Sequence, residues 1–120
     1  MKTVILGATD KKHRAAYRAA ELLEKSGNEW IPIGIRPSTL LDRSILDLKE
    51  RPLIEDVHTV TLYIGAENQP EWYDYIISLK PKRLIFNPGT ENTELWQMAK
   101  NNGIEVENAC TLVLLSIGRY

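Results

Sequence analysis

The sequence has little cysteine and no long apolar segment. Of its 120 residues only Cys110 is a cysteine, so no disulfide can form within the chain. The N-terminal apolar run, Val4-Ile5-Leu6, is too short for a signal peptide. No stretch approaches the roughly 20 apolar residues of a membrane span. We therefore expect a cytoplasmic protein that makes no membrane contact.

The chain also has little net charge and few groups suited to catalysis. Fifteen basic side chains stand against sixteen acidic ones, without the excess of Lys and Arg that non-specific nucleic-acid binding needs. The two histidines, His13 and His58, have no metal-ligand spacing, and no serine lies in a nucleophile-elbow motif. The sequence identifies no catalytic residue and no metal site, which favours a binding protein over an enzyme.

What the chain does contain is enough apolar residues, 43%, for one core. We expect residues 1–120 to form a single domain. Apolar runs that end at turns predict strands at 4–6, 30–33, 57–64, 83–86 and 104–106. Helical periodicity predicts helices at 16–26, 68–79, 92–102 and 111–115. Residues 36–56 give no clear prediction.

This alternation of strands and helices predicts an α/β domain with a mainly parallel sheet. In such sheets a ligand binds beyond the carboxyl ends of the strands, where the strand order reverses. The segments that follow the predicted strands, residues 7–14, 34–37, 63–68 and 87–91, are therefore the candidate site.

The first of these segments has the features of a phosphate-binding turn. A helix N-terminus presents free N–H groups and a partial positive charge, and the small residues Gly7, Ala8 and Thr9 let a ligand approach the backbone. Asp10 completes the turn, and the basic residues Lys11, Lys12, His13 and Arg14 follow it. Only one of the three glycines of G-x-G-x-x-G is present, so an ordinary strand-to-helix turn is the competing interpretation.

The later segments narrow the class of ligand. NAD-binding proteins place an Asp or Glu after the second strand, whereas this chain has Gly34 and Arg36. An arginine there favours a phosphorylated ribose, as in NADP or coenzyme A (CoA). Tyr63 and Gly65 suit an adenine edge or a pantetheine arm. Asn87-Pro88-Gly89 forms a rigid turn at the same edge.

Several segments together match a known pattern. They are residues 4–9 (similar to V-x-G-A-S), Tyr17-Arg18 in the first helix, Trp30 to Gly34 in the second strand, Phe86 to Asn92 (similar to W-x-Q-x-G-x-x-N), and Gly103 to Val106 followed by Cys110. Over its whole length the chain resembles the small CoA-binding domains, stand-alone relatives of the N-terminal domain of the succinyl-CoA synthetase α subunit.

The resemblance implies a Rossmann-like, doubly wound α/β/α fold of three layers that binds CoA or an acyl-CoA, with the pyrophosphate at residues 7–10. It implies no reaction, because the phosphohistidine of the synthetase belongs to another domain. The expected ligand-binding residues are Gly7, Ala8, Thr9, Asp10, Arg14, Tyr17, Arg18, Gly34, Arg36, Tyr63, Gly65, Asn87, Pro88 and Gly89.

Two other functions stay open at this point. In the first, the chain is a small oxidoreductase that uses NADP, whose 2′-phosphate Arg36 would bind. In the second, it is an interaction module that has lost its ligand and presents Trp72 and Tyr75 on an exposed surface. A homodimer or a larger complex is compatible with each function.

Overall fold

The computed structural model describes residues 1–120, which form eight strands and four α-helices. The strands are β1 (Lys2–Leu6), β2 (Glu29–Gly34), β3 (Thr39–Leu40), β4 (Arg43–Ser44), β5 (Leu46–Asp47), β6 (Thr59–Leu62), β7 (Arg83–Phe86) and β8 (Glu105–Asn108). The α-helices are α1 (Ala15–Lys25), α2 (Tyr73–Ser78), α3 (Thr93–Asn101) and α4 (Thr111–Ser116). Short 3-10 turns η1 (Leu48–Glu50), η2 (Ala66–Asn68) and η3 (Pro70–Trp72) complete the chain.

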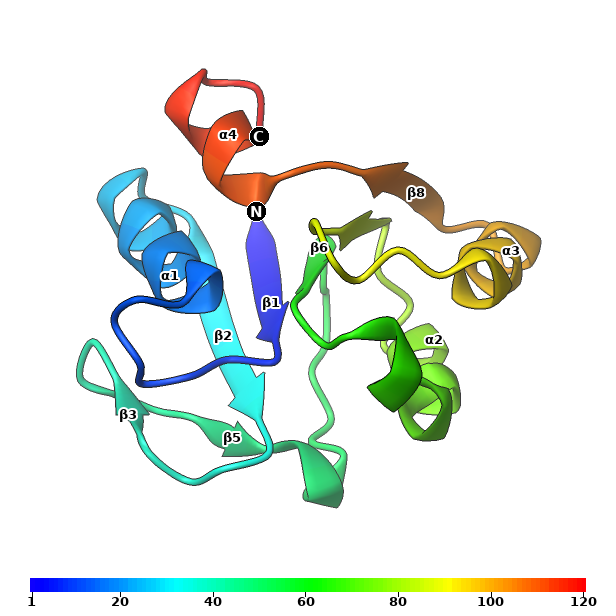
Figure 1. The fold of residues 1–120 in the computed structure, drawn as a ribbon, viewed down its shortest axis with the longest axis horizontal. Helices are drawn as coiled ribbons and strands as arrows, with labels where there is room; N and C mark the ends of the chain where they lie inside the picture. Colours follow the sequence, from blue (N-terminus) through cyan, green and yellow to red (C-terminus); the bar gives the residue numbers. More distant parts are fainter.

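Six strands form one sheet in the order β5-β2-β1-β6-β7-β8, and all neighbouring pairs are parallel. Helices α1 and α4 cover one face of this sheet, and α2 and α3 cover the other (Figure 1). The fold is therefore the expected Rossmann-like, three-layer α/β/α arrangement.

Strand β1 divides the hydrophobic core into two parts because its side chains alternate between the faces. Val4 and Leu6 belong to the larger part, with α2 and α3, and Ile5 belongs to the smaller part, with α1. All three side chains are fully buried. This explains why the apolar run of β1 is continuous, as in strands of parallel sheets covered on both faces.

The strand order reverses at β1. The chain runs from β1 to β2 and β5 on one side, and then returns to β6 on the other side of β1. Leu6 pairs with Ile33 of β2 and with Leu62 of β6, so these three strands end at the same level. A ligand-binding crevice is expected between the segments that leave these ends.

Helix α1 follows the predicted pattern. Ala16, Ala19, Ala20 and Leu23 are buried and form its inner face. Gly27 has φ +77°, and the N–H of residue 28 donates to the carbonyl of Leu23 (3.0 Å). This left-handed glycine is the helix end that the sequence predicts.

Residues 36–56, for which the sequence gives no clear prediction, contain an antiparallel hairpin of β3 and β4 and the edge strand β5. Each of these strands has two residues, too few to produce a periodic pattern. Leu40, Ile45 and Leu48 are buried and attach the segment to the rest of the molecule.

The prediction for residues 57–79 is partly wrong. Strand β6 is shorter than the predicted strand 57–64, and the predicted helix 68–79 begins as 3-10 turns, so that α2 starts only at Tyr73. The side chain of Gln69 explains the irregular start. It is fully buried and donates to the carbonyls of Ile64 (2.7 Å) and Thr90 (2.8 Å), which fixes the chain against the neighbouring loop.

The expectation that Trp72 and Tyr75 form an exposed surface is wrong. Their side chains are 6% and 5% exposed and belong to the larger part of the core. Tyr75 donates from its hydroxyl to the carbonyl of Pro52 (2.6 Å) and so holds the extended segment 51–58. The two aromatic residues pack in the core and do not form the exposed surface expected of an interaction module.

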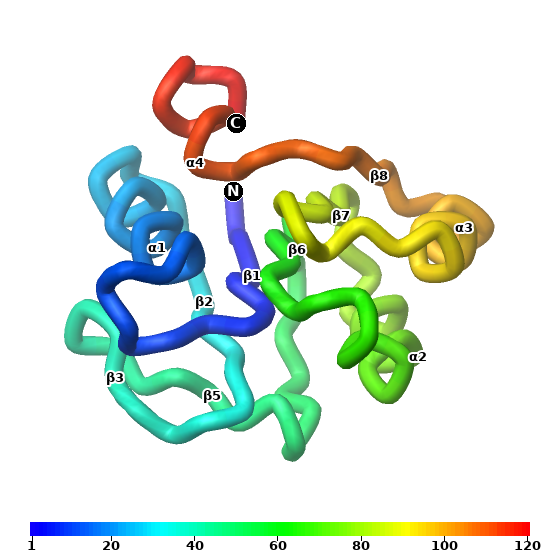
Figure 2. Tube along the Cα trace, in the orientation of Figure 1, coloured from blue at the N-terminus to red at the C-terminus, as the bar shows by residue number.

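The two ends of the chain lie close together, as the tube in Figure 2 shows. The hydroxyls of Thr3 and Tyr120 are 2.6 Å apart. Tyr120 also packs under the guanidinium of Arg83, which lies 4.6 Å from the ring centroid. None of the helices combines the length and apolarity that a membrane span requires.

Candidate functional site

A crevice of about 960 Å³ lies beyond the carboxyl ends of β1, β2 and β6. Its volume is at the upper end of the range for small-molecule sites, about 300–1,000 Å³. Of the residues expected from the sequence to bind a ligand, nine line it: Gly7, Ala8, Thr9, Asp10, Arg14, Arg36, Tyr63, Gly65 and Pro88. The structure thus brings together segments that are far apart in the sequence.

Gly7 shapes the turn by its conformation. It has φ +100°, and a Cβ atom would lie 3.0 Å from the backbone carbonyl carbon of Tyr63. The N–H groups of Gly7 and Ala8 both donate to the carbonyl of Ile33 (2.9 and 3.0 Å). These two N–H groups are therefore already hydrogen-bonded within the protein. The absence of a side chain at Gly7 allows β1, β2 and β6 to lie close together.

The free backbone donors of the crevice lie at Thr9 and Asp10 in the turn and further along, where α1 begins. No side chain caps this helix, and its first turn contains no acidic residue. The N–H groups of Ala15 and Ala16 have no acceptor. By contrast, the side chain of Asn92 accepts hydrogen bonds from two N–H groups at the start of α3. The open end of α1 is therefore suited to an anion in a way that the closed end of α3 is not.

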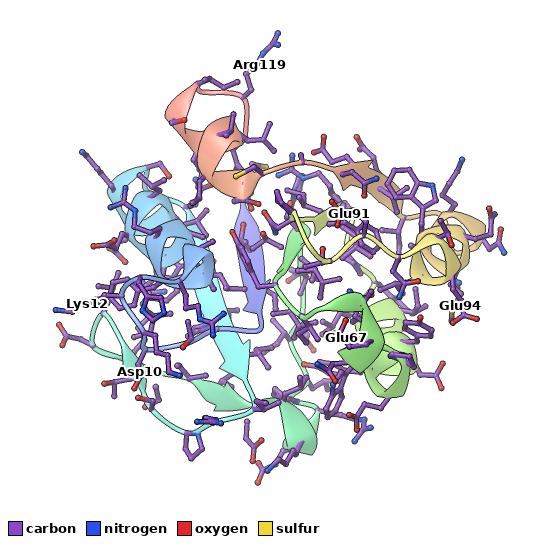
Figure 3. All side chains as sticks on the ribbon, viewed as in Figure 1. Asp10, Lys12, Glu67, Glu91, Glu94 and Arg119 are labelled. Carbon is purple, nitrogen blue, oxygen red and sulfur yellow. The ribbon has the colours of Figure 1, made fainter.

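Three cationic side chains, Lys11, Arg14 and Arg36, line the crevice, and none lies within 4.0 Å of a carboxylate oxygen. The carboxylates that line the crevice belong to Asp10 and Glu71. That of Asp10 accepts a hydrogen bond from the hydroxyl of Ser38 (2.6 Å). Asp10 thus joins the first turn to the segment after β2. Figure 3 labels Asp10 on this loop.

Apolar side chains form another wall of the crevice. They are Ile35, Ile45, Leu48 and Trp72. Ile35 lies in the candidate segment 34–37, whereas the sequence does not place the other three at the site. Ile45 and Leu48 lie in the segment without a clear prediction. Ile35 is 55% exposed although it is large and apolar. No pattern in the sequence marks Ile45, Leu48 or Trp72 as lining a site.

Tyr63 lines the crevice, and its hydroxyl is buried without a hydrogen-bond partner. Burial raises the pKa of this phenol to about 12, although the nearby hydroxyls of Thr61 and Thr111 act in the opposite direction. Those two hydroxyls bond to each other (2.8 Å). The phenol is therefore a neutral donor at physiological pH.

Five of the expected ligand-binding residues do not line the crevice. Tyr17 packs against the smaller part of the core, and Arg18 pairs with Glu21 of its own helix (3.8 Å). Gly34 is buried, and the space beside it is filled: a Cβ there would lie 2.5 Å from the carbonyl oxygen of Ala8. The side chain of Asn87 is buried in a hydrogen-bond network, and Gly89 lies on an exposed turn.

Groups for metal binding or nucleophilic chemistry do not gather at the site. No three His, Cys, Asp or Glu side chains come together as a metal-ligand set. Cys110 is half-buried at the start of α4, outside the crevice. The arrangement is one of donors, cations and apolar surface, which is suited to holding an anionic, partly apolar molecule.

Comparisons with known proteins agree with this geometry. A family model described as a CoA binding domain matches residues 1–116. The crystal structure of an uncharacterized protein is 55% identical in sequence and superimposes with a TM-score of 0.95; the match covers 99% of this chain and 97% of that chain. A search of curated proteins finds no match.

Two more distant structures are similar in fold. One is the PH1109 protein redesigned for binding, with 19% identity, a TM-score of 0.86 and coverage of 99% of this chain and 84% of that chain. The other is the protein cell-free ID.343 from Thermus thermophilus, with 18% identity, a TM-score of 0.85 and coverage of 99% and 90%.

Proposed function

Because the chain belongs to the CoA-binding domain family, we propose that it binds CoA or an acyl-CoA in the crevice beyond β1, β2 and β6. It acts as a carrier, a sensor or a subunit and catalyses no reaction itself. The observation that carries this proposal is the uncapped N-terminus of α1, which opens on a crevice lined by three unpaired cationic side chains.

The pyrophosphate of CoA is held at the start of α1. The free N–H groups of Ala15 and Ala16 donate to it, and Lys11 and Arg14 supply positive charge beside the turn. Within the expected turn, residues 7–10, the N–H groups of Gly7 and Ala8 are bonded to Ile33, whereas those of Thr9 and Asp10 are free to donate to the pyrophosphate as well.

Arg36 binds the phosphate on the ribose. It is exposed at the crevice and has no carboxylate partner, so its guanidinium is available for a bidentate contact. The apolar wall of Ile35, Ile45 and Leu48 accepts the less polar parts of the ligand.

We predict that Arg36→Gln weakens binding of CoA about fivefold to tenfold and leaves binding of dephospho-CoA unchanged. A charge-assisted hydrogen bond contributes about 1.5–3 kcal/mol, and the exposure of Arg36 places the effect at the lower end. Isothermal titration calorimetry measures the affinities, and a rise in melting temperature with CoA reports binding to the folded state.

Arg119→Gln is the matched control, because Arg119 is exposed on the far side of α4 (Figure 3). The proposal fails if CoA at millimolar concentration binds neither protein. Tight binding of NADP in place of CoA would instead favour the oxidoreductase function, since Arg36 is equally suited to a 2′-phosphate.

A further inference from the structure

A second cavity, of about 630 Å³, lies beside the crevice, between the loop after β6 and the start of α3. Residues from η2, α2, α3 and β8 line it: Ala66, Glu67, Tyr73, Glu91, Asn92, Thr93, Trp96 and Asn108. None of these residues lines the crevice itself. The proposed function therefore leaves this cavity without a role.

The two hollows are bordered by the same two loops. In the loop after β6, Gly65 faces the crevice and the next residues, Ala66 and Glu67, face the cavity. In the loop after β7, Pro88 faces the crevice and Glu91 faces the cavity. A ligand that extends from the crevice across these loops enters the cavity next.

The border between the hollows is held firmly. The buried amide of Gln69 donates to carbonyls of both loops, those of Ile64 and Thr90. Asn92 donates to the side-chain oxygens of Gln69 and Tyr73 (2.8 Å each). The loops thus have a fixed relative position before any ligand arrives.

The polar lining of the cavity carries negative charge. Figure 3 labels Glu67 and Glu91 on the two loops. A carboxylate oxygen of Glu67 lies 2.8 Å from the point where a Cβ of Gly65 would be, so this side chain folds back over the border between the hollows. Glu91 accepts a hydrogen bond from the N–H of Gly89 (2.8 Å). Neither carboxylate lies within 4.0 Å of a Lys or Arg nitrogen.

The remaining wall is aromatic. The rings of Tyr73 and Trp96 line the cavity and are half-buried. Trp96 is held against Phe86, with ring centroids 5.8 Å apart. Aromatic rings beside carboxylates are suited to a cation, because both attract positive charge.

We propose that this cavity receives the acyl group of a CoA thioester, and that Glu67 and Glu91 make it select acyl groups with a positive charge over anionic ones. This inference rests on the proposed function, since the crevice must hold the nucleotide part of the ligand. It adds the class of ligand: an aminoacyl or quaternary-ammonium thioester of CoA.

Three thioesters of similar length test the selection: β-alanyl-CoA is cationic, propionyl-CoA is neutral and succinyl-CoA is anionic at the far end. We expect β-alanyl-CoA to bind about threefold to tenfold more tightly than propionyl-CoA, and succinyl-CoA to bind more weakly by a similar factor. In 1 M KCl the differences should shrink to less than twofold, because the Debye length falls to about 3 Å.

The double variant Glu67→Gln, Glu91→Gln should bind all three thioesters within twofold and retain the affinity for CoA. Glu105→Gln is the matched control, because Glu105 is an exposed carboxylate outside both hollows. The Glu105→Gln variant should show the same differences in affinity among the three thioesters as the unsubstituted protein.

Three results would overturn the inference. If CoA binds and the three thioesters have equal affinities in the unsubstituted protein, the acyl selection is wrong while the proposed function stands. If neither CoA nor any thioester binds, both are wrong. A preference that survives in the double variant would exclude the two carboxylates as its cause.

Discussion

At the scale of single residues, Gly7 allows a turn in which a Cβ atom would be in the way, as the sequence predicts. The sequence places it in a phosphate-binding turn, and the structure uses it to let β6 approach β1. A side chain there would combine a strained φ of +100° with a 3.0 Å contact to the backbone of Tyr63. The turn is thus fixed by packing, and the free N–H groups of the crevice lie at Thr9, Asp10, Ala15 and Ala16.

His58 is a second residue whose surroundings have a measurable consequence. It lies before β6, and Nδ1 is 2.8 Å from the hydroxyl of Thr59. Burial lowers the pKa of His58 below its usual 6.5, and the charges of Arg83, Lys82 and the N-terminus lower it further, while Glu105 opposes them. The folded state therefore binds a proton at His58 less readily than the unfolded state does.

We predict that the free energy of unfolding falls as the pH drops below about 6.5, and that His58→Gln makes this fall shallower. The contribution of His58 is fully present above the unfolded pKa and is lost as the pH falls through the lowered folded value. Urea unfolding at pH 7.5, 6.5, 5.8 and 5.0 measures the slope. His13→Gln, on the exposed loop before α1, is the control, and an equal change of slope in both variants would contradict the assignment.

At the scale of elements, Asn87 connects two strands and a helix. Its side-chain amide donates to Thr61 (2.7 Å) and to the carbonyl of Leu62 (2.9 Å) of β6, and its side-chain oxygen accepts from the N–H of Thr111 at the start of α4. Asn87 is 2% exposed, so each bond is shielded from water. The residue holds α4 to the sheet.

Asn87→Ala should lower the free energy of unfolding by about 2–4 kcal/mol, because three buried hydrogen bonds are lost and the N–H of Thr111 is left without a partner. Urea unfolding measures the loss. The same change at Asn101, an exposed residue at the end of α3, should cost less than about 0.5 kcal/mol. An equally small loss at Asn87 would show that the network contributes little.

The elements that the sequence predicts well are those with a strong local signal. Strand β7 is a continuous buried run of four residues, and helix α1 has a buried face that follows the helical period; the sequence predicts both. The 3-10 turn η3 lies within the predicted helix 68–79. The start of this segment departs from the prediction because its course depends on hydrogen bonds from Gln69 to distant carbonyls. Such long-range bonds leave no trace in a local pattern.

At the scale of the whole molecule, one sheet separates two hydrophobic clusters. Trp30 belongs to the smaller cluster with α1, and Trp72 belongs to the larger one with α2 and α3. Trp96 packs against the larger cluster. β1 contributes side chains to both clusters. Unfolding of either cluster would therefore displace β1 and disrupt the other cluster.

We therefore predict that the molecule unfolds in a single transition. In the variant Trp30→Phe, fluorescence reports the larger cluster alone, while circular dichroism at far-ultraviolet wavelengths reports all helices and strands. The two urea transitions should have the same midpoint and slope. Separate midpoints would mean that the two clusters unfold independently.

The sequence predicts which segments of the chain form the candidate site better than it predicts which side chains line it. The rule that ligands bind beyond parallel strands selects the segments after β1, β2 and β6, and residues from all three line the crevice. The resemblance adds Arg18 of α1 to Arg36 among the expected ligand-binding residues, yet Arg36 lines the crevice and Arg18 pairs with Glu21 of its own helix. That difference depends on side-chain direction, which the spacing of residues along the chain does not contain.

The position of β1 in the middle of the sheet has a consequence for synthesis on the ribosome. β1 is made first, but its partner β6 follows roughly fifty residues later, which takes about 3 to 10 seconds at ordinary translation rates. A nascent chain that ends before β6 already contains the basic turn and α1, yet it lacks the wall formed by Tyr63 and Gly65. The complete crevice therefore forms only after more than half of the protein has been translated.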